Sequence, residues 1–443
     1  MIKVQHYNPV DNHGGAARAA FRIVRALVAC ANATDIEASM RVIRKYSECI
    51  DVIGGSPPVS VTKRIAAKAE RLGRRFLVSQ GDPFKSLNPS TLDLCINKSA
   101  FNFEINQASV DVLHLHWLGN YLGVDSLSIE EIGRLSKPVV WTLHDQWAFC
   151  GAEHYVTPPP AVDERFAEGY TAANRPSHES GPDLNRHTWE RKRRSWQRPM
   201  HIVCPSTWLA DCARRSALMR SWPITVIPYP IDLKVWAPCD QAQARRLLGL
   251  PLDRRLVLFG AIGGTGDPRK GADLLLKAHV HLKATATGIA LEQLELVIFG
   301  QSRPAELPDL GFPVHYSGQL HDDISLRLLY AAADVFVIPS RQDNLPNTGI
   351  EAHACGTPVV AFRTGGLVDI VEDRITGALA EPFDPASLAA AIAWVLDDPQ
   401  RRRKLGVAAR QRAERLWEPA RIAGLYAEVY RQAVAAASPA SIF

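Results

Sequence analysis

Residues 339–360 read PSRQDNLPNTGIEAHACGTPVV, and their order of apolar and polar residues indicates the fold class. It follows the apolar run 335–338 and ends in a second apolar run that begins at Val359. A polar loop and a short helical segment lie between the two runs, and Gly356 is suited to end the helix. Strand, loop, helix and strand in this order are typical of a parallel sheet covered by helices. We therefore predict an α/β protein.

Two acidic residues mark the same stretch, Asp343 in the loop and Glu351 in the helix, with seven residues between them. In open parallel sheets ligands bind beyond the carboxyl ends of the strands, so both carboxylates are expected to face one crevice. There they can reach different parts of a polyhydroxylated ligand, and the helix start offers N–H groups to acceptor oxygens. The alternative is that Asp343 and Asn344 only cap a turn and that Glu351 is a solvated helix residue.

Size and composition narrow the class of protein. A chain of 443 residues, 47% of them hydrophobic, is expected to form two domains with separate cores. A net charge of +5 is too weak for a dedicated nucleic-acid binder, but it suits anionic ligands or an anionic membrane surface. The eight cysteines are scattered without zinc spacing, which predicts reduced thiols in a cytosolic protein and no metal site. No signal peptide or membrane-spanning run is apparent, so a soluble or peripheral protein is expected.

The first strand is predicted over residues 2–7, and an amphipathic helix follows a loop that ends in Gly14-Gly15. Glycines at such a junction let the backbone approach a ligand, and the helix start favours an anion. A glycine pair is also ordinary loop geometry.

Two later strands both end in histidine. Residues 110–117 finish in His116-Trp117, and residues 138–145 contain an apolar run that finishes in His144-Asp145. Parallel strands place these ends at one edge of the sheet, which predicts an edge lined with imidazoles. A lone histidine at such a place is more often structural.

Two basic segments have two interpretations each. Residues 61–77 combine an apolar stripe with basic positions from Lys63 to Arg75, which suits an anionic membrane or simply a solvated helix face. Residues 189–196 begin a second basic helix, which suits an anionic acceptor or, again, solvent. The polar, proline-rich segment 146–188 is expected to be a functional lid or disordered.

A diphosphate site is predicted after the strand at 256–260. Glycines of the following loop and the pair Arg269-Lys270 precede a helix, so backbone N–H groups, a helix dipole and two cations converge. Gly271 follows the lysine where a Walker loop has Ser or Thr, which excludes that motif.

The acidic stretch, Lys270-Gly271 and the turn Thr364-Gly365-Gly366 together resemble the signature of the retaining GT-B glycosyltransferases of family 4, the glycosyl transferases group 1. Asp343 stands where Glu is commoner in that family, which resembles the branch that makes colanic acid and other exopolysaccharides. The resemblance implies two Rossmann-like doubly wound domains facing a central cleft. Residues 1–230 would form the acceptor side, residues 231–418 would bind the nucleotide sugar, and the helix in 419–443 would pack back on the first domain.

The resemblance also implies the site residues. Glu351 would hold the ribose, Asp343 would lie beside the transferred sugar, and Lys270 would stabilise the leaving group. Arg269 would replace an arginine that the family has where Ala261 and Ile262 stand here. The implied sets are: catalytic, Asp343, Lys270 and His144; donor-binding, Gly14, Gly15, Arg269, Lys270, Asn344, Leu345 and Glu351; acceptor side, His116, Trp117 and Asp145.

The implied activity is retaining transfer of a hexosyl group from a nucleotide-diphosphate sugar to a glycan or lipid-linked acceptor in polysaccharide biosynthesis. Neither a metal nor a cofactor is implied, and nucleic acid is not an expected partner. The expected location is the cytoplasm, with attachment to the inner face of the plasma membrane as a variant. Two other functions stay open: a noncatalytic sugar-nucleotide-binding protein, and an epimerase or phosphorylase of the GT-B fold.

Overall fold

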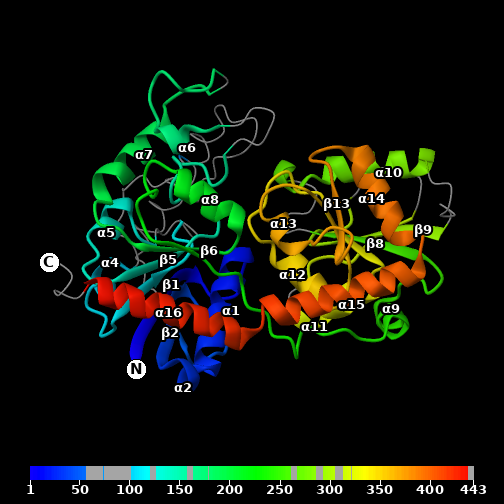
Figure 1. The fold of residues 1–443 in the computed structure, drawn as a ribbon, viewed down its shortest axis with the longest axis horizontal. Helices are drawn as coiled ribbons and strands as arrows, with labels where there is room; N and C mark the ends of the chain where they lie inside the picture. The colour runs from blue at the N-terminus through cyan, green and yellow to red at the C-terminus, as the bar shows by residue number, and fades with distance from the viewer. Residues whose placement is uncertain are drawn as a thin grey trace. The chain divides into compact units, whose positions relative to one another are not determined.

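The computed structural model describes residues 1–55, 73, 101–119, 126–156, 163–177, 179–260, 267–285, 293–304, 313–320 and 322–437. The chain divides into two compact units (Figure 1). Unit 1 contains Met1–Tyr229 and Pro419–Phe443, and unit 2 contains Pro230–Glu418. The predicted basic helix at 61–77 lies, except for Gly73, outside the described residues. Among the described residues, no helix is long and apolar enough to cross a membrane.

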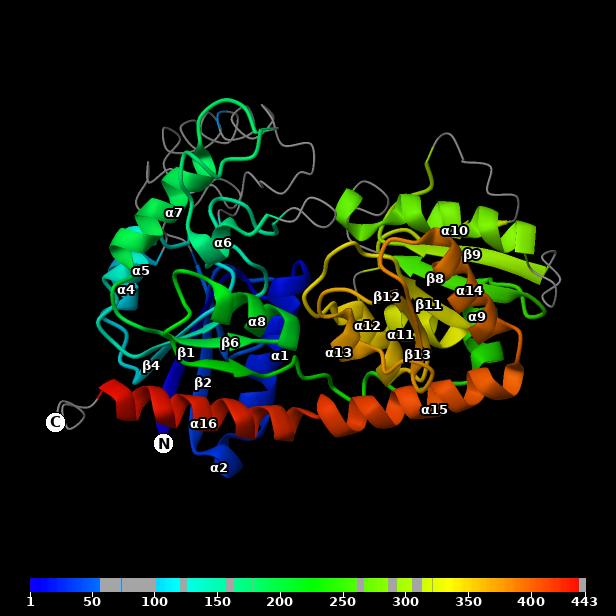
Figure 2. The same ribbon diagram turned by 45° about the horizontal axis from the view of Figure 1, so that its top comes forward.

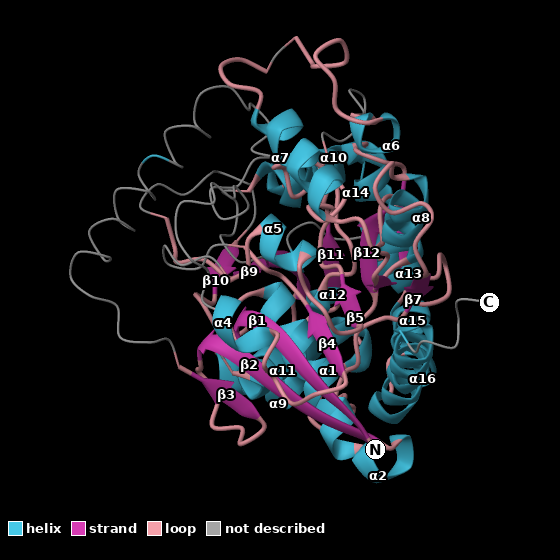
Figure 3. Ribbon diagram, turned by 90° about the vertical axis from the view of Figure 1, so that its left-hand side faces the viewer, coloured by secondary structure: helices cyan, strands magenta, loops and turns pink. Residues whose placement is uncertain are grey.

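Unit 1 is organised around a sheet of seven parallel strands in the order β3-β2-β1-β4-β5-β6-β7. Figure 3 shows the part of this sheet from β3 to β5. From β1 the chain moves toward one edge through β2 and β3, and β4 then starts the other half of the sheet. The switch point between β1 and β4 is where ligands bind in such sheets. The strands are β1 (Ile2–Val10), β2 (Ile36–Arg44), β3 (Val52–Gly54), β4 (Val112–Leu115), β5 (Val139–Thr142), β6 (His201–Cys204) and β7 (Ile224–Val226).

Helix α16 (Pro419–Ala437) belongs to unit 1, although it is the last helix of the chain. It packs beside α1 (Gly15–Ala29) and against β4 and β5 (Figure 2). Its buried Tyr426 and Tyr430 therefore reach the sheet. The other helices in the described part of the unit are α2 (Ala31–Thr34), α4 (Asn102–Ile105), α5 (Ile129–Gly133), α6 (Arg165–Glu168), α7 (Leu184–Ser195) and α8 (Thr207–Arg215).

The described part of the segment 146–188 contributes to the core of unit 1. Its aromatic side chains Trp147, Phe149, Phe166 and Tyr170 are buried in the same apolar cluster as Trp141 of β5. The expectation of a lid or a disordered insertion is therefore wrong for the described part of this segment. Composition suggested it because prolines and polar residues separate the aromatic anchors widely along the chain.

Helix α7 does not present a uniformly solvated basic face. Lys192 is fully buried, and its ammonium group donates hydrogen bonds to the carbonyl oxygens of Trp147, Cys150 (3.0 Å) and Gly151 (2.7 Å). The same group lies 3.9 Å from the centre of the Trp147 ring. Lys192 thus anchors the segment after β5. At this position the helix neither offers its charge to an anionic acceptor nor faces solvent, so both predicted interpretations are wrong for Lys192.

Unit 2 repeats the architecture with six parallel strands in the order β10-β9-β8-β11-β12-β13. Here the switch point lies between β8 and β11. The strands are β8 (Arg255–Gly260), β9 (Leu294–Phe299), β10 (Val314–Tyr316), β11 (Val335–Ile338), β12 (Val359–Phe362) and β13 (Gly377–Ala380). Its helices are α9 (Gln241–Leu248), the 3-10 turn η2 (Pro268–Lys270), α10 (Ala272–Thr285), α11 (Asp323–Ala332), α12 (Asn347–Ala354), α13 (Leu367–Ile370), α14 (Pro385–Leu396) and α15 (Pro399–Leu416).

Candidate functional site

Two loops meet at the switch point of unit 2. The turn η2 comes before α10, and the polar loop after β11 lies against it. Gly271 ends η2 with φ of +68°, and a Cβ there would lie 1.9 Å from the carbonyl oxygen of Pro339. Only glycine fits so close to that carbonyl in this left-handed conformation. The Lys270-Gly271 pair therefore brings the lysine to the polar loop.

Lys270 and Asp343 form the centre of this site. The lysine Nζ lies 2.6 Å from Oδ2 of Asp343, and the Ser340 hydroxyl donates to the same oxygen at 3.2 Å. The Asp343 side chain is 8% exposed, so the pair is largely shielded from water. Burial disfavours the carboxylate, but Lys270 and Arg269 outweigh burial and lower the pKa of Asp343. Burial lowers the pKa of Lys270 against the opposing pull of Asp343.

Arg269 completes the charged group. Its guanidinium lies 3.6 Å from Oδ1 of Asp343, donates to the carbonyl of Gln342 at 3.0 Å, and pairs with Asp267 at 3.2 Å. Asp267 also accepts a hydrogen bond from the backbone N–H of Arg269, which fixes η2. Two cations thus meet the carboxylates of Asp343 and Asp267, and the N–H groups of Arg269 and Lys270 are of the kind that binds phosphate oxygens.

Backbone contacts hold the Asp343 loop from both sides. On one side, the N–H of Arg341 donates to the carbonyl of Arg269 at 2.8 Å. On the other, the N–H of Gly366 donates to the carbonyl of Asp343 at 2.9 Å. Gly365 has φ of +55°, and a Cβ there would lie 2.5 Å from that same carbonyl. The glycine turn therefore positions Asp343. The next two residues of the loop, Asn344 and Leu345, are buried.

Glu351 lies on α12 with only 2% of the residue exposed. Its Oε2 accepts a hydrogen bond of 3.0 Å from the hydroxyl of Tyr330, a fully buried residue of α11. The two acids of the opening stretch therefore have different partners: Asp343 has cations, and Glu351 has a phenol. Tyr330 was missed by the sequence analysis because an aromatic residue inside an apolar helix is read as core.

In unit 1, the strand β1 runs on to Val10, three residues beyond the predicted strand end. Gly14 follows with φ of +91° and caps α1, which begins at Gly15. The backbone N–H groups of this helix start lie after β1, beside the switch point. The glycine pair is placed where the sequence predicted it, and its role toward a ligand stays a prediction.

The four polar and aromatic residues predicted at the ends of β4 and β5 line one pocket. They are His116, Trp117, His144 and Asp145, and the apolar neighbours include Trp141 and Leu143. Nδ1 of His116 lies 3.1 Å from Nε2 of His144. The structure thus brings together both strand ends that finish in histidine.

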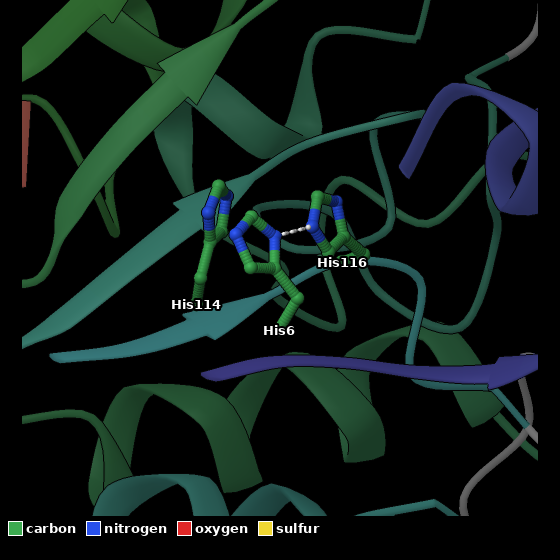
Figure 4. Close-up of side chains that lie close together, drawn as sticks. All are labelled: His6, His114 and His116. Atoms are coloured by element: carbon green, nitrogen blue, oxygen red, sulfur yellow. Dashed lines mark hydrogen bonds between the residues drawn. The ribbon is translucent and has the colours of Figure 1, made fainter. Parts of the chain in front are cut away.

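Two further histidines lie behind this pair, and the sequence analysis missed both. His6 of β1 and His114 of β4 are fully buried and lie opposite each other in the strand register. Nδ1 of His6 is 2.9 Å from Nε2 of His116 (Figure 4). The signal was present, because residues 114 and 116 share one face of a strand. Burial lowers the pKa of His6 and of His144 to about 3, so these rings are neutral at pH 7.

His6, His114 and His116 each offer a nitrogen within 4.8 Å of the others, as a metal site requires. Their rings, however, are stacked or only moderately tilted: the planes of His6 and His116 differ by 14°, those of His114 and His116 by 23°, and those of His6 and His114 by 37°. Imidazole lone pairs lie in the ring plane, so in this arrangement they do not converge on one ion. The nitrogens instead bond to one another, to Thr142 and to Tyr430. We therefore assign this cluster to hydrogen bonding.

Two parallel doubly wound sheets, each with polar side chains at its switch point, define the class of protein: an α/β chain with the GT-B glycosyltransferase fold. Residues 254–398 match the family model described as glycosyl transferases group 1, and residues 50–235 match that of glycosyltransferase family 4.

Solved structures support the same fold. Sucrose-phosphate synthase from Thermosynechococcus elongatus superimposes with a TM-score of 0.67 at 21% identity, over 98% of this chain and 100% of that one. HepE from Anabaena, solved in complex with UDP-glucose, superimposes with a TM-score of 0.60 at 16% identity, over 98% of this chain and 100% of HepE. WaaG, a glycosyltransferase involved in lipopolysaccharide biosynthesis, superimposes with a TM-score of 0.60 at 16% identity, over 96% of this chain and 99% of WaaG.

The curated relatives similar in sequence to this chain are named D-inositol 3-phosphate glycosyltransferases. The D-inositol 3-phosphate glycosyltransferase of Thermobispora bispora is 34% identical over 221 residues, which are 48% of this chain and 51% of the relative. That of Xylanimonas cellulosilytica is 35% identical over 227 residues, 47% and 51% respectively. The chain therefore spans about half the length of these curated relatives. Their names differ from the colanic acid branch that Asp343 suggested, so membership of that branch stays a prediction.

Proposed function

We propose that the chain is a glycosyltransferase that uses a nucleotide-diphosphate sugar. The observation that carries this proposal is the shielded pair of Lys270 and Asp343, joined by Arg269, at the switch point of unit 2. The cations suit a diphosphate, and the carboxylate suits the adjoining sugar. The match of residues 254–398 to the group 1 glycosyltransferases supports this interpretation.

The proposed reaction is retaining. The bond between the anomeric carbon and a diphosphate oxygen breaks, and its electron pair stays on that oxygen. A new bond forms from the anomeric carbon to an acceptor hydroxyl oxygen on the same face of the sugar, and the hydroxyl proton passes to the departing diphosphate. Lys270, with Arg269, stabilises the charge that grows on the leaving oxygen. The step needs neither a dedicated base nor a metal ion.

Glu351 and Asp343 have separate roles in this proposal. Glu351, oriented by the Tyr330 hydroxyl, binds the ribose hydroxyls of the nucleotide. Asp343 lies beside the transferred sugar, where positive charge develops at the anomeric carbon. Asn344 and Leu345 shape the loop on the donor side. In unit 1, the helix start at Gly14 and Gly15 offers N–H groups to an anionic part of a ligand.

For the acceptor we propose a glycan or a lipid-linked sugar of polysaccharide biosynthesis, bound at the pocket of His116, Trp117, His144 and Asp145. Aromatic faces with polar groups beside them suit a sugar ring. The names of the curated relatives favour a second acceptor, inositol 3-phosphate. The basic stripe from Lys63 to Arg75 would place the reaction at the cytoplasmic face of an anionic membrane.

A ligand screen followed by a transfer assay tests the function. The chain is titrated with UDP-, GDP- and ADP-sugars, beginning with UDP-glucose because HepE binds it. A donor at about 100 times its Kd should add roughly 2.7 kcal/mol to the free energy of unfolding. The stabilising donor is then incubated with inositol 3-phosphate, with oligosaccharides and with lipid-linked sugars, and products are separated by chromatography.

Each outcome of this experiment decides between functions. A stabilising donor that is transferred to one acceptor class supports the proposal and identifies the acceptor. Donor binding without transfer or hydrolysis, under all acceptors, favours the noncatalytic sugar-nucleotide-binding protein. Conversion of the donor sugar alone favours an epimerase. If no nucleotide sugar stabilises the chain, the assignment of the site in unit 2 is wrong.

A further inference from the structure

Four histidines of unit 1, of which His6, His114 and His116 are buried and His144 is half-buried, are connected in a single chain of hydrogen bonds. The Tyr229 hydroxyl lies 2.8 Å from Nδ1 of His144, and Nε2 of His144 lies 3.1 Å from Nδ1 of His116. Nε2 of His116 lies 2.9 Å from Nδ1 of His6. The chain therefore starts at a tyrosine, passes through the pocket and reaches the first strand of the sheet.

The chain continues into the C-terminal helix. Nε2 of His6 lies 3.4 Å from the hydroxyl of Tyr430, and that hydroxyl lies 2.7 Å from Nδ1 of His114. Nε2 of His114 then lies 2.8 Å from the hydroxyl of Thr142. Every one of the four rings is entered at Nδ1 and left at Nε2. No ring nitrogen of the four is without a partner in this part of the structure.

Contacts between two ring nitrogens restrict the tautomers. A neutral imidazole carries one N–H and one lone pair, so a nitrogen–nitrogen contact is a hydrogen bond only if one of the two nitrogens carries the hydrogen. His144, His116 and His6 are joined by two such contacts in series. If one ring holds its hydrogen on Nε2, the other two must do the same; if one holds it on Nδ1, all three do.

The tyrosines decide between these two states. A phenol is a stronger hydrogen-bond donor than a neutral imidazole N–H, and an imidazole lone pair is a stronger acceptor than a phenol oxygen. Tyr229 and Tyr430 both make their short contacts at Nδ1, the first with His144 and the second with His114. Both contacts therefore favour a lone pair on Nδ1 and the hydrogen on Nε2. The long contact from His6 to Tyr430 fits a phenol that accepts there and donates to His114.

We propose that His144, His116 and His6 form one tautomer-coupled relay in the Nε2–H state, and that His6 and Tyr229 are positioning residues for the ring that His144 presents to the pocket. The relay gives His144 a lone pair at Nδ1, which Tyr229 occupies. A ligand that displaces the tyrosine must then supply a donor such as a sugar or cyclitol hydroxyl. The pocket therefore selects hydroxyl donors over carbonyl and carboxylate oxygens at this point. This selection deepens the proposed acceptor site, whereas the relay itself does not depend on sugar transfer.

Nitrogen NMR on the full chain labelled with 15N-histidine tests the relay, because the nitrogen chemical shift distinguishes N–H from a lone pair. We expect Nε2–H for all three rings at pH 7. In Tyr229→Phe the ring remains stacked on His144, at 5.5 Å between centroids in the native pair, but the donor at Nδ1 is lost. Since a hydrogen bond contributes on the order of 1 kcal/mol, the tautomer ratio should change about five- to tenfold. The three rings should change together and by the same fraction.

Tyr426→Phe is the matched control. It also removes one buried hydroxyl from unit 1, but that hydroxyl contacts Thr142 at 3.0 Å, on the far side of Tyr430. Without Tyr426, the Thr142 hydroxyl can still accept from Nε2 of His114, so the contacts of Tyr430 with His114 and His6 are kept and the three tautomers should remain as in the native chain.

Three outcomes would overturn the relay. Opposite tautomers at two neighbouring rings of the native protein contradict it without any variant. A change confined to His144 in Tyr229→Phe contradicts the coupling. Stoichiometric binding of added Zn²⁺ that shifts the His6 and His114 nitrogens would show a metal site in its place. Because the readout needs no sugar donor, failure of the relay and failure of the proposed transferase activity are distinguishable.

Discussion

Lys270 and Asp343 lie 73 positions apart in the chain, yet their charged atoms are 2.6 Å apart at the switch point of unit 2. The contact joins the turn before α10 to the loop after β11. Gly271 permits the approach on one side and Gly365 on the other, since a Cβ at either position would collide with a backbone carbonyl. The same pair is therefore a structural clasp between two loops and the centre of the proposed donor site.

A double-mutant cycle should show strong coupling between these two residues. Lys270→Met leaves a largely buried carboxylate with only the more distant Arg269, which should cost about 3 kcal/mol of unfolding free energy. Asp343→Asn should also destabilise, but the double variant should recover about 1–3 kcal/mol relative to the sum. Urea unfolding of the four proteins measures these values.

The exposed pair Arg214–Asp211 is the control for this cycle. Its N–O distance is 2.9 Å, but the two side chains are 49% and 69% exposed. Exposed pairs of this kind couple by less than about 1 kcal/mol. If the effects of the Lys270 and Asp343 substitutions are additive, with a coupling energy no larger than that of the control pair, the clasp is contradicted.

Apolar runs in the sequence predicted several of the parallel strands, although β13 was not among them. The runs that include 112–115 and 139–142 were found because buried parallel strands are continuously apolar, and the runs at 256–260 and 335–338 for the same reason. The acidic stretch predicted the place of Asp343 and Glu351, since a strand followed by a polar loop fixes which end of the sheet the loop occupies. The α/β fold itself was thus readable from local patterns.

Tertiary partners were not readable in this way. Nothing local shows that Lys192 meets three carbonyl oxygens of the segment after β5, so its burial was missed. The same holds for Tyr330 beside Glu351 and for His6 beside His116, 110 positions away. Such contacts depend on strand order and on loop geometry, neither of which a single sequence determines.

As the pH is lowered, unit 1 should begin to lose stability at a pH well above that at which carboxylates become protonated. Burial lowers the pKa of His6 and of His144 to about 3, against about 6.5 in the unfolded chain. Below pH 6.5 the unfolded state binds protons that the folded state does not, so stability falls as the pH falls toward 3. Each such histidine contributes a slope of about 1.4 kcal/mol per pH unit, and the lowered pKa of His114 and of His116 acts in the same direction.

Among the described residues of the unit, Glu153 opposes this trend. Burial raises the pKa of Glu153 to about 7, so its contribution to stability is present at low pH and is lost as the pH rises through 7. The four histidines outnumber Glu153, so the free energy of unfolding should still rise with pH between pH 5 and 6.5. Urea midpoints at pH 7, 6 and 5 measure the slope. His187→Gln, at an exposed position, is the control that should leave it unchanged; a midpoint that stays constant or rises from pH 7 to 5 would contradict the burial of neutral histidines.

Membrane attachment through the basic stripe is open to a direct test. Replacing Arg71, Arg74 and Arg75 with Gln should weaken binding to vesicles that contain anionic lipid by roughly 1 kcal/mol per charge. Transfer to soluble acceptors should remain intact. Cosedimentation at low salt measures the binding, with neutral vesicles and Arg214→Gln as controls. A native chain that does not sediment with anionic vesicles would remove the membrane from the proposed function.

The two acids of the donor site should separate binding from chemistry. Glu351 interacts with the ribose before and during the reaction, so Glu351→Gln should weaken binding of the free nucleoside diphosphate and raise KM. Asp343→Asn should mainly lower kcat, because Asp343 acts where charge develops in the transition state. It also removes a negative charge beside Lys270 and Arg269, so the anionic nucleotide should bind as well as before or more tightly.

Calorimetry with the free nucleotide, beside steady-state kinetics of both variants, makes this comparison. Tyr330→Phe is a graded control for Glu351: it deletes the 3.0 Å hydrogen bond to the carboxylate and should reduce nucleotide affinity by less than Glu351→Gln does. Suppose instead that Asp343→Asn abolishes nucleotide binding while Glu351→Gln leaves it unchanged. The donor would then lie in the reverse orientation, with its nucleotide at Asp343 and its sugar toward α12, and the roles proposed for Lys270 and Glu351 would both fail.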